Sequence, residues 1–137
     1  MGKYQDLKVY TKAFELAMKI YHLSLKFPSD EKFGLTSQIR RSSRSVCSNI
    51  AEGYRKRRYE PHFISKLTDA DMKNSETIVW IDFAISCGFI NAGTKDKLTM
   101  KTEEIRKLLY DKKSQKISLR TVIYQQQIPD YRLLTAD

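Results

Sequence analysis

Residues 34–58 read GLTSQIRRSSRSVCSNIAEGYRKRR and combine an apolar helical pattern, small side chains and seven basic residues. At about 100° per residue, one arc of the helix, roughly 100° wide, contains Leu35, Ile39, Ser43, Val46, Ile50 and Tyr54. A second arc of similar width, centred about 150° away, contains Arg40, Arg41, Arg44 and Arg55. The stretch therefore predicts a helix that buries one side and presents a row of guanidinium groups on the other.

The charge of the chain is concentrated in this stretch. The 137 residues carry a net charge of +9, and residues 35–60 alone hold seven basic and two acidic side chains. More than half of the positive excess therefore falls on the second helix and the turn after it. This concentration favours a polyanionic partner, nucleic acid above all, over the alternative of a solvated basic face that only keeps the protein soluble.

The composition argues against several other classes of protein. No apolar run approaches the ~18 residues of a membrane span, and the first ten residues lack the apolar core of a signal peptide, so we expect a cytoplasmic protein. Cys47 and Cys87 are far apart within helical patterns, which favours reduced thiols over a disulfide or a metal site. The sequence has no glycine-rich phosphate loop and no metal-spaced His or Cys set, so we expect no metal and no cofactor.

Apolar periodicity, with Pro and Gly at its breaks, predicts four helices joined by short links. The first spans residues 6–27, the second starts at about Leu35 and closes with basic residues 55–58, and the third spans about 61–87. The fourth is expected to be capped by Thr94 and to end or fray within residues 111–116. This pattern indicates an all-α fold, an antiparallel up-down four-helix bundle.

The bundle is expected to occupy residues 1–112, followed by a C-terminal tail over residues 113–137. The tail is too apolar to be simply disordered, so we expect it to dock on the bundle or on a neighbouring subunit.

Two of the helices carry informative apolar stripes. The first helix has two neighbouring stripes, which are Leu7, Tyr10, Phe14, Ala17, Tyr21 and Leu25, and Val9, Ala13, Leu16, Ile20, Leu23 and Phe27. Because a chain this short cannot surround such a helix, we expect one of its sides to pack against another subunit. The third helix repeats every seven residues at Phe63, Leu67, Ala70, Asn74, Thr77, Ile81 and Ala84. Here Asn74 is expected to fix the register, as a buried polar residue does in coiled coils.

Several short motifs carry a resemblance to a known family. They are DLKVY at residues 6–10, GLTSQIRR at 34–41, SNIAEGY at 48–54 and GFI at 88–90, together with Phe63, Leu67, Ala70 and Glu76. Over roughly residues 4–110, the chain resembles the four-helix-bundle family of proteins encoded by intervening sequences in bacterial 23S rRNA genes. That family is related to the accessory variability determinant of diversity-generating retroelements, which looks similar in fold and assembles as a pentameric, basic barrel.

The resemblance implies a homopentamer with nucleic-acid or reverse-transcriptase partners. The chain departs from the family at Met72-Lys73, where the family often has a small Gly-Ser pair, a change that bears on a close helix contact. After Tyr110 it follows no family pattern.

The favoured hypothesis is a non-enzymatic, oligomeric nucleic-acid-binding protein. Phosphate contacts are predicted for the basic side chains of the second helix and its turn, namely Arg40, Arg41, Arg44, Arg55, Lys56, Arg57 and Arg58. Tyr54 and Tyr59 lie near enough to stack on unpaired bases, which favours RNA over duplex DNA.

Two alternatives stay open. The first is a scaffold that assembles with itself or with a protein partner such as a reverse transcriptase, without binding nucleic acid, its arginines pairing with Glu52 and Glu76. The second is an enzyme, because Arg57 and His62 have the Arg-x4-His spacing that resembles a pair in some helical-bundle ribonucleases. An arginine-rich turn produces that spacing easily by chance, so no catalytic residue is assigned.

Overall fold

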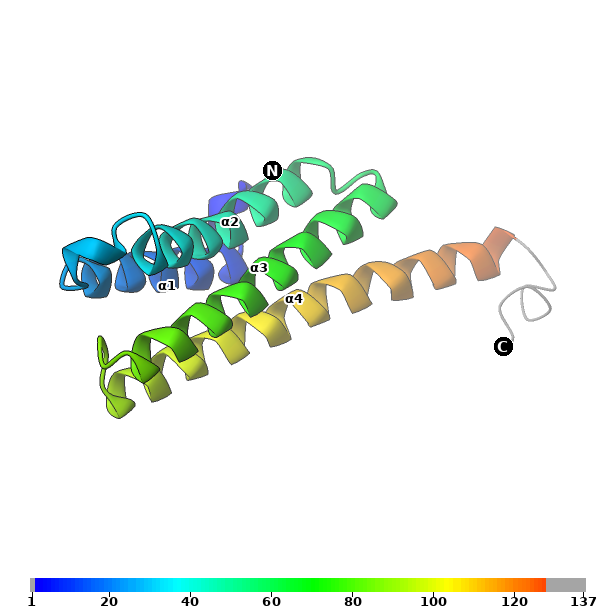
Figure 1. Cartoon of the computed structure of the whole chain (residues 1–137). Coiled ribbons are helices and arrows are strands. Elements are labelled where there is room, and N and C mark those ends of the chain that lie inside the picture. Colours follow the sequence, from blue (N-terminus) through cyan, green and yellow to red (C-terminus); the bar gives the residue numbers. More distant parts are fainter. Residues whose placement is uncertain (1, 128–137) are drawn as a thin grey trace.

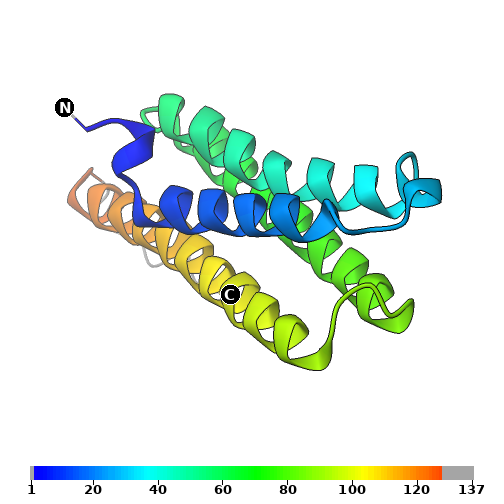
Figure 2. The ribbon, with the colours of Figure 1, turned by 90° about the vertical axis from the view of Figure 1, so that its left-hand side faces the viewer.

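Four α-helices form the fold in this computed structural model, which describes residues 2–127 and the side chains of residues 2–113. They are α1 Lys8–Ser24, α2 Leu35–Arg55, α3 Glu60–Ser86 and α4 Ala92–Gln127, with short 3-10 turns at Tyr4–Asp6 and Ser29–Glu31. Each helix contacts the next, and α4 also contacts α1, so α1 and α3 lie on one diagonal of the bundle (Figure 1, Figure 2). No strand occurs between residues 2 and 127. The predicted all-α, antiparallel up-down bundle is confirmed.

The helices bury the stripes that their periodicity predicts. All seven repeat positions of α3 are buried, and on α2 the buried positions include Leu35, Ile39, Val46 and Ile50. Of the two stripes on α1, the one that contains Val9 and Leu16 faces the core, whereas Phe14 and Leu25 of the other are 50% and 59% exposed. Part of the second stripe is therefore left uncovered by residues 2–127 of the same chain.

Buried polar residues tie α3 to both of its neighbours. Asn74, 1% exposed, donates from Nδ2 to the carbonyl oxygen of Thr102 on α4 over 2.9 Å. Thr77 donates from Oγ1 to the hydroxyl of Ser42 on α2 over 2.8 Å. Because an unmade buried hydrogen bond costs about 1–3 kcal/mol, these two bonds disfavour any slip of α3 along its neighbours.

The N-terminus of α4 differs from the prediction. The side-chain oxygen of Asn91 accepts the backbone N–H of Thr94 over 2.8 Å, so Asn91 and not Thr94 caps the helix. An Asn before the first turn satisfies a donor that the helix itself leaves free. The connection before it turns at Gly88, whose φ of 77° lies in the left-handed region that favours glycine.

The C-terminus of α4 also differs, because the expected end within residues 111–116 is wrong. The helix continues through this polar segment to Gln127. Lys, Gln, Arg and Leu favour helices, and neither Gly nor Pro interrupts the chain before Pro129. The remaining tail, residues 128–137, lies outside the described residues, as does its predicted docking. Among residues 2–127, none of the helices combines the length and the apolar character that crossing a bilayer requires.

Gly53 allows α2 and α3 to approach closely. A Cβ atom at this position would lie 3.1 Å from Cβ of Lys66 and 3.6 Å from the carbonyl oxygen of Phe63. We predict that Gly53→Leu lowers the free energy of unfolding by about 1–3 kcal/mol, because the added side chain overpacks this contact. Gly53→Ala is the matched control, since its gain in helix propensity of about 1 kcal/mol offsets the tight contact. Urea unfolding measures both, and equal stability of the Leu variant and the wild type would contradict close packing here.

Candidate nucleic-acid interface

The predicted basic row lies on α2, but the structure divides it into two groups. Arg40 and Arg44 lie against α1. Nε of Arg40 donates to Oγ of Ser24 over 2.7 Å, and the guanidinium carbons of Arg40 and Arg44 lie 4.9 Å and 5.8 Å from the centroid of the Tyr21 ring. Arg40 is half-buried and holds α1 to α2, whereas Arg44 remains exposed beside the same ring.

A second set of contacts closes the C-terminal end of α2. The guanidinium carbon of Arg57 lies 4.1 Å from the centroid of the Tyr54 ring, and Nη1 donates to the carbonyl oxygen of Tyr54 over 2.9 Å. The Tyr54 hydroxyl in turn donates to the carbonyl oxygen of Gly2 over 2.8 Å. Tyr54 and Arg57 thus anchor the N-terminal segment to the end of α2, near the α2–α3 connection (Figure 2). One face of the Tyr54 ring is covered, so Tyr54 is a poorer platform for a base than the sequence predicts.

The remaining predicted residues are exposed. They are Arg41 and Arg55 on α2, and Lys56, Arg58 and Tyr59 in the turn before α3. Tyr59 is 59% exposed, and its ring meets the ring of His62 edge to face with centroids 4.5 Å apart. Among the described residues, none of Arg41, Arg55 and Arg58 makes an ion pair with a carboxylate. The exposed basic surface, which we define as Arg41, Arg55, Lys56 and Arg58, is therefore open to an external anion.

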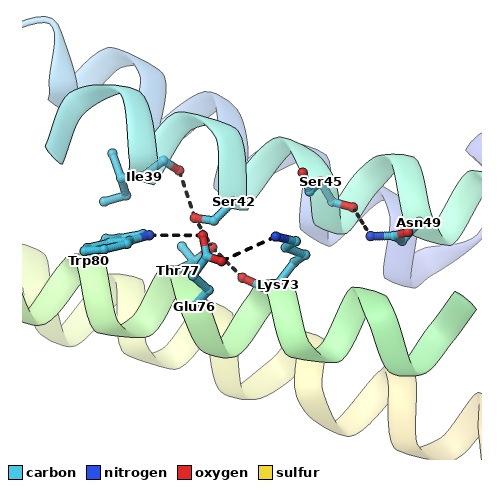
Figure 3. A network of polar contacts seen from close by, with 8 residues as sticks. All are labelled: Ile39, Ser42, Ser45, Asn49, Lys73, Glu76, Thr77 and Trp80. Atoms are coloured by element: carbon cyan, nitrogen blue, oxygen red, sulfur yellow. Dashed lines mark hydrogen bonds and ion pairs between the residues drawn. The ribbon is translucent and has the colours of Figure 1, made fainter. Parts of the chain in front are cut away.

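The carboxylates expected to neutralise the arginines are bound elsewhere. Glu52 pairs with Lys66 on α3, Oε2 to Nζ, over 2.8 Å, and this hydrogen bond and the charge of Lys66 lower the pKa of the Glu52 carboxyl. Glu76 pairs with Lys73 over 3.4 Å and accepts the indole N–H of Trp80 over 3.2 Å. Figure 3 shows Glu76 between these two partners on α3, facing the polar side of α2. Among the described residues, neither Glu52 nor Glu76 pairs with an arginine, so the pairing predicted under the scaffold hypothesis is not found there.

The described residues offer little support for catalysis. Arg57 packs on Tyr54 and His62 packs on Tyr59, so the two residues of the Arg-x4-His spacing contact different tyrosines. Burial raises the pKa of the Cys47 thiol to about 11, which keeps it protonated and unreactive at neutral pH. Within the described part of the chain, no group of three or more His, Cys, Asp or Glu side chains is arranged to hold a metal ion.

A family model described as 23S rRNA-intervening sequence protein matches residues 5–111 of the chain. The chain belongs to the 23S rRNA-intervening sequence protein family. The matched region contains α1 to α3, the first part of α4 and the whole exposed basic surface, and it ends sixteen residues before Gln127. The resemblance predicted from the SNIAEGY and GLTSQIRR motifs is confirmed.

A solved structure shows the same fold. It is the crystal structure of a protein with unknown function from the S23 ribosomal protein family of Bacteroides thetaiotaomicron. That protein is 29% identical to this member of the 23S rRNA-intervening sequence protein family, with a TM-score of 0.71, and the alignment covers 77% of this chain and 95% of that chain. No curated protein matches the sequence.

The contacts that reasoning from the sequence missed lie between helices. The sequence predicts apolar packing for Tyr21 and assigns no role to Ser24. In the structure, Ser24 accepts a hydrogen bond from Arg40, and the Tyr21 ring lies beside the guanidinium groups of Arg40 and Arg44. A partial signal exists, because residues that flank the turn between two antiparallel helices lie near each other. Ser24 ends α1 and Arg40 lies in the second turn of α2, but their distances from the connection differ, so spacing alone does not pair them. At Met72-Lys73, Met72 is 57% exposed on the outside of α3, whereas Lys73 is half-buried and pairs with Glu76 on the side of α3 that faces α2 (Figure 3).

Proposed function

We propose that this protein is a non-enzymatic, homopentameric nucleic-acid-binding protein that favours RNA and binds it through the basic face of α2 and the turn after it. The observation that carries the proposal is the exposed basic surface, four exposed cationic side chains that form no ion pair with a carboxylate among the described residues, although Lys56 lies near enough to Glu52 to lower the pKa of its carboxyl. Such groups gain most from phosphate oxygens, which supply affinity without sequence specificity. Arg44 is exposed beside Tyr21 and extends the surface along α2, whereas Arg40 and Arg57 hold the scaffold.

The exposed ring of Tyr59 supports a preference for unpaired nucleotides. It lies directly after Lys56 and Arg58, so a chain of phosphates that contacts the turn brings its bases close to the ring. Stacking of a base on an aromatic ring contributes about 1–3 kcal/mol and requires a base that is free of its duplex partner. Single-stranded segments and loops of RNA fit this surface better than duplex DNA.

We predict that Tyr59→Ala weakens binding to an RNA hairpin with a single-stranded tail by about 5- to 150-fold, the equivalent of one stacked base. Binding to a fully paired RNA of the same length should change little. Tyr110→Ala, which removes a 65% exposed tyrosine from α4, is the matched control. Fluorescence anisotropy with labelled RNA measures these affinities. An equal loss for the paired and the tailed RNA would argue against base stacking.

Self-association rests on two supports. Family membership brings with it the expectation of a homopentamer. The uncovered side of α1, where Phe14 and Met18 are 50% and 40% exposed, offers the apolar surface that subunit contacts bury. The same apolar surface also supports the second candidate function, a scaffold that holds a protein partner such as a reverse transcriptase and binds no nucleic acid.

Light scattering on nucleic-acid-free protein, with and without a short RNA hairpin, separates the two candidates. The proposal predicts a defined oligomer whose mass increases by that of bound RNA at low salt. A defined oligomer that takes up no RNA at any salt concentration would support the scaffold and overturn the proposed binding function.

A further inference from the structure

Two apolar surfaces lie on different sides of the bundle, and the described residues of the chain cover neither of them. One is a groove between α1 and α4, which we call the basic groove, defined by Phe14, Met18, Met100, Lys19, Lys97 and Lys101. The other is the outward side of α3, which we call the acidic ridge, defined by Met72, Val79, Phe83, Asp69, Glu76 and Asp82. Because α1 and α3 are diagonal in the bundle, the two surfaces face different directions (Figure 2).

The two surfaces have complementary shapes. The basic groove has a volume of about 1120 Å³. Its apolar lining is formed by Phe14, Met18 and Met100, and Met100 is 73% exposed. On the acidic ridge, Met72, Val79 and Phe83 are 57%, 47% and 53% exposed. These three residues are spaced by seven and four, so they form one straight row on α3, opposite its buried stripe. A straight apolar row on one helix fits a groove between two others.

Their charges are also complementary. The carboxylates of the groove are neutralised in part within the chain, since Glu15 and Glu104 share Lys12, and Glu103 pairs with Arg106. By contrast, the groove lysines Lys19, Lys97 and Lys101 have no ion-pair partner among the described residues. The groove is therefore basic in effect.

The ridge is acidic, but less strongly than the groove is basic. Asp69 is exposed and makes no ion pair within the described part of the chain, whereas the Asp82 carboxylate, 60% exposed, pairs with Lys95 over 3.8 Å. Glu76 is bound by Lys73 and Trp80 at the edge of the ridge. A groove set against a second groove brings lysines together, and a ridge against a ridge brings carboxylates together, so neither surface suits a copy of itself.

We propose that the basic groove of one copy of this chain binds the acidic ridge of the next copy, in a head-to-tail contact. This deepens the self-association that the proposed function includes, and it rests on that part of the proposed function alone. A head-to-tail contact leaves a groove and a ridge free at the ends of any open assembly, and it repeats until the array closes into a ring or extends as a filament. The groove opens between α1 and α4, whereas the ridge faces outward from α3, which adjoins α4. Because the two surfaces face different directions, each added copy is rotated relative to the copy before it.

Mixing two variants tests the contact. The groove variant carries Met18→Glu and Met100→Glu, which set new carboxylates against those of the ridge. The ridge variant carries Val79→Lys and Phe83→Lys, which set new lysines against those of the groove. All four positions are at least 40% exposed, so the helical content and the unfolding midpoint should match those of the wild type. Ser29→Glu and Ser29→Lys are charge controls at an exposed position in the α1–α2 connection.

Light scattering measures the mass of each nucleic-acid-free protein. If the contact forms, the wild type and the controls are larger than a dimer, and either variant alone has the 16.0 kDa mass of a monomer. An equimolar mixture should form a one-to-one dimer and nothing larger, because the intact ridge of the groove variant fits the intact groove of the ridge variant. Dimers of either variant alone, a monomeric mixture or a monomeric wild type would overturn the inference. RNA binding is measured separately, so dimers in the mixture without any RNA binding would refute the proposed binding function and leave the contact standing.

Discussion

Reversing two charges of the exposed basic surface, with Arg41→Glu and Arg58→Glu in one chain, is expected to weaken RNA binding by about a hundredfold at low salt. Both side chains are exposed and neither pairs with a carboxylate among the described residues, so the bundle loses no contact of its own. Each reversal removes a phosphate contact and places a carboxylate beside the phosphates. The dependence of affinity on salt should also fall by about one unit of slope for each lost contact.

The control for this variant has the same net charge. Lys26→Glu with Lys32→Glu changes the charge equally, but outside the exposed basic surface, around the α1–α2 connection and at the opposite end of α2 from Arg58 (Figure 1). We expect this control to lose less than about threefold in affinity, the share that belongs to net charge alone. Equal losses in the two variants, measured by anisotropy on the same RNA, would show that overall charge and not this surface determines binding.

Ile50→Ala is expected to lower the free energy of unfolding by about 3 kcal/mol. Ile50 is fully buried on the side of α2 opposite the arginines, and removing three carbon atoms there leaves a cavity that the four helices fill only in part. The measurement is chemical unfolding followed by circular dichroism. Leu25→Ala, at a site that is 59% exposed, is the control and should cost less than about 1 kcal/mol. Similar losses at both sites would mean that α2 is turned differently about its axis, which would also displace the basic surface.

Sequence reasoning succeeded where the signal is local to one helix. The seven-residue repeat of α3 and the arc of α2 that contains Ile39 and Ile50 depend only on helical geometry, and the structure buries both as predicted. Asn74 was placed on the core stripe for the same reason. The motifs at 34–41 and 48–54 were specific enough to predict the family.

Sequence reasoning failed where the contact of a side chain depends on a residue that is distant along the chain. The hydroxyl of Tyr54 is taken by the carbonyl of Gly2, and Arg40 is taken by Ser24, so two residues of the predicted interface have structural contacts. Helical periodicity states which way a side chain points but not which groups of the next helix meet it. The end of α4 was misplaced because a polar segment was read as a helix end although no glycine or proline breaks it.

The most direct test of nucleic-acid binding by the exposed basic surface is the salt dependence of RNA affinity for nucleic-acid-free wild-type protein. Four phosphate contacts to a single strand predict that the logarithm of the association constant falls with the logarithm of the salt concentration, with a slope of about −3. Anisotropy titrations from low to physiological salt provide that slope. An affinity that stays unchanged across this range, or no binding at the lowest salt concentration, would contradict the account.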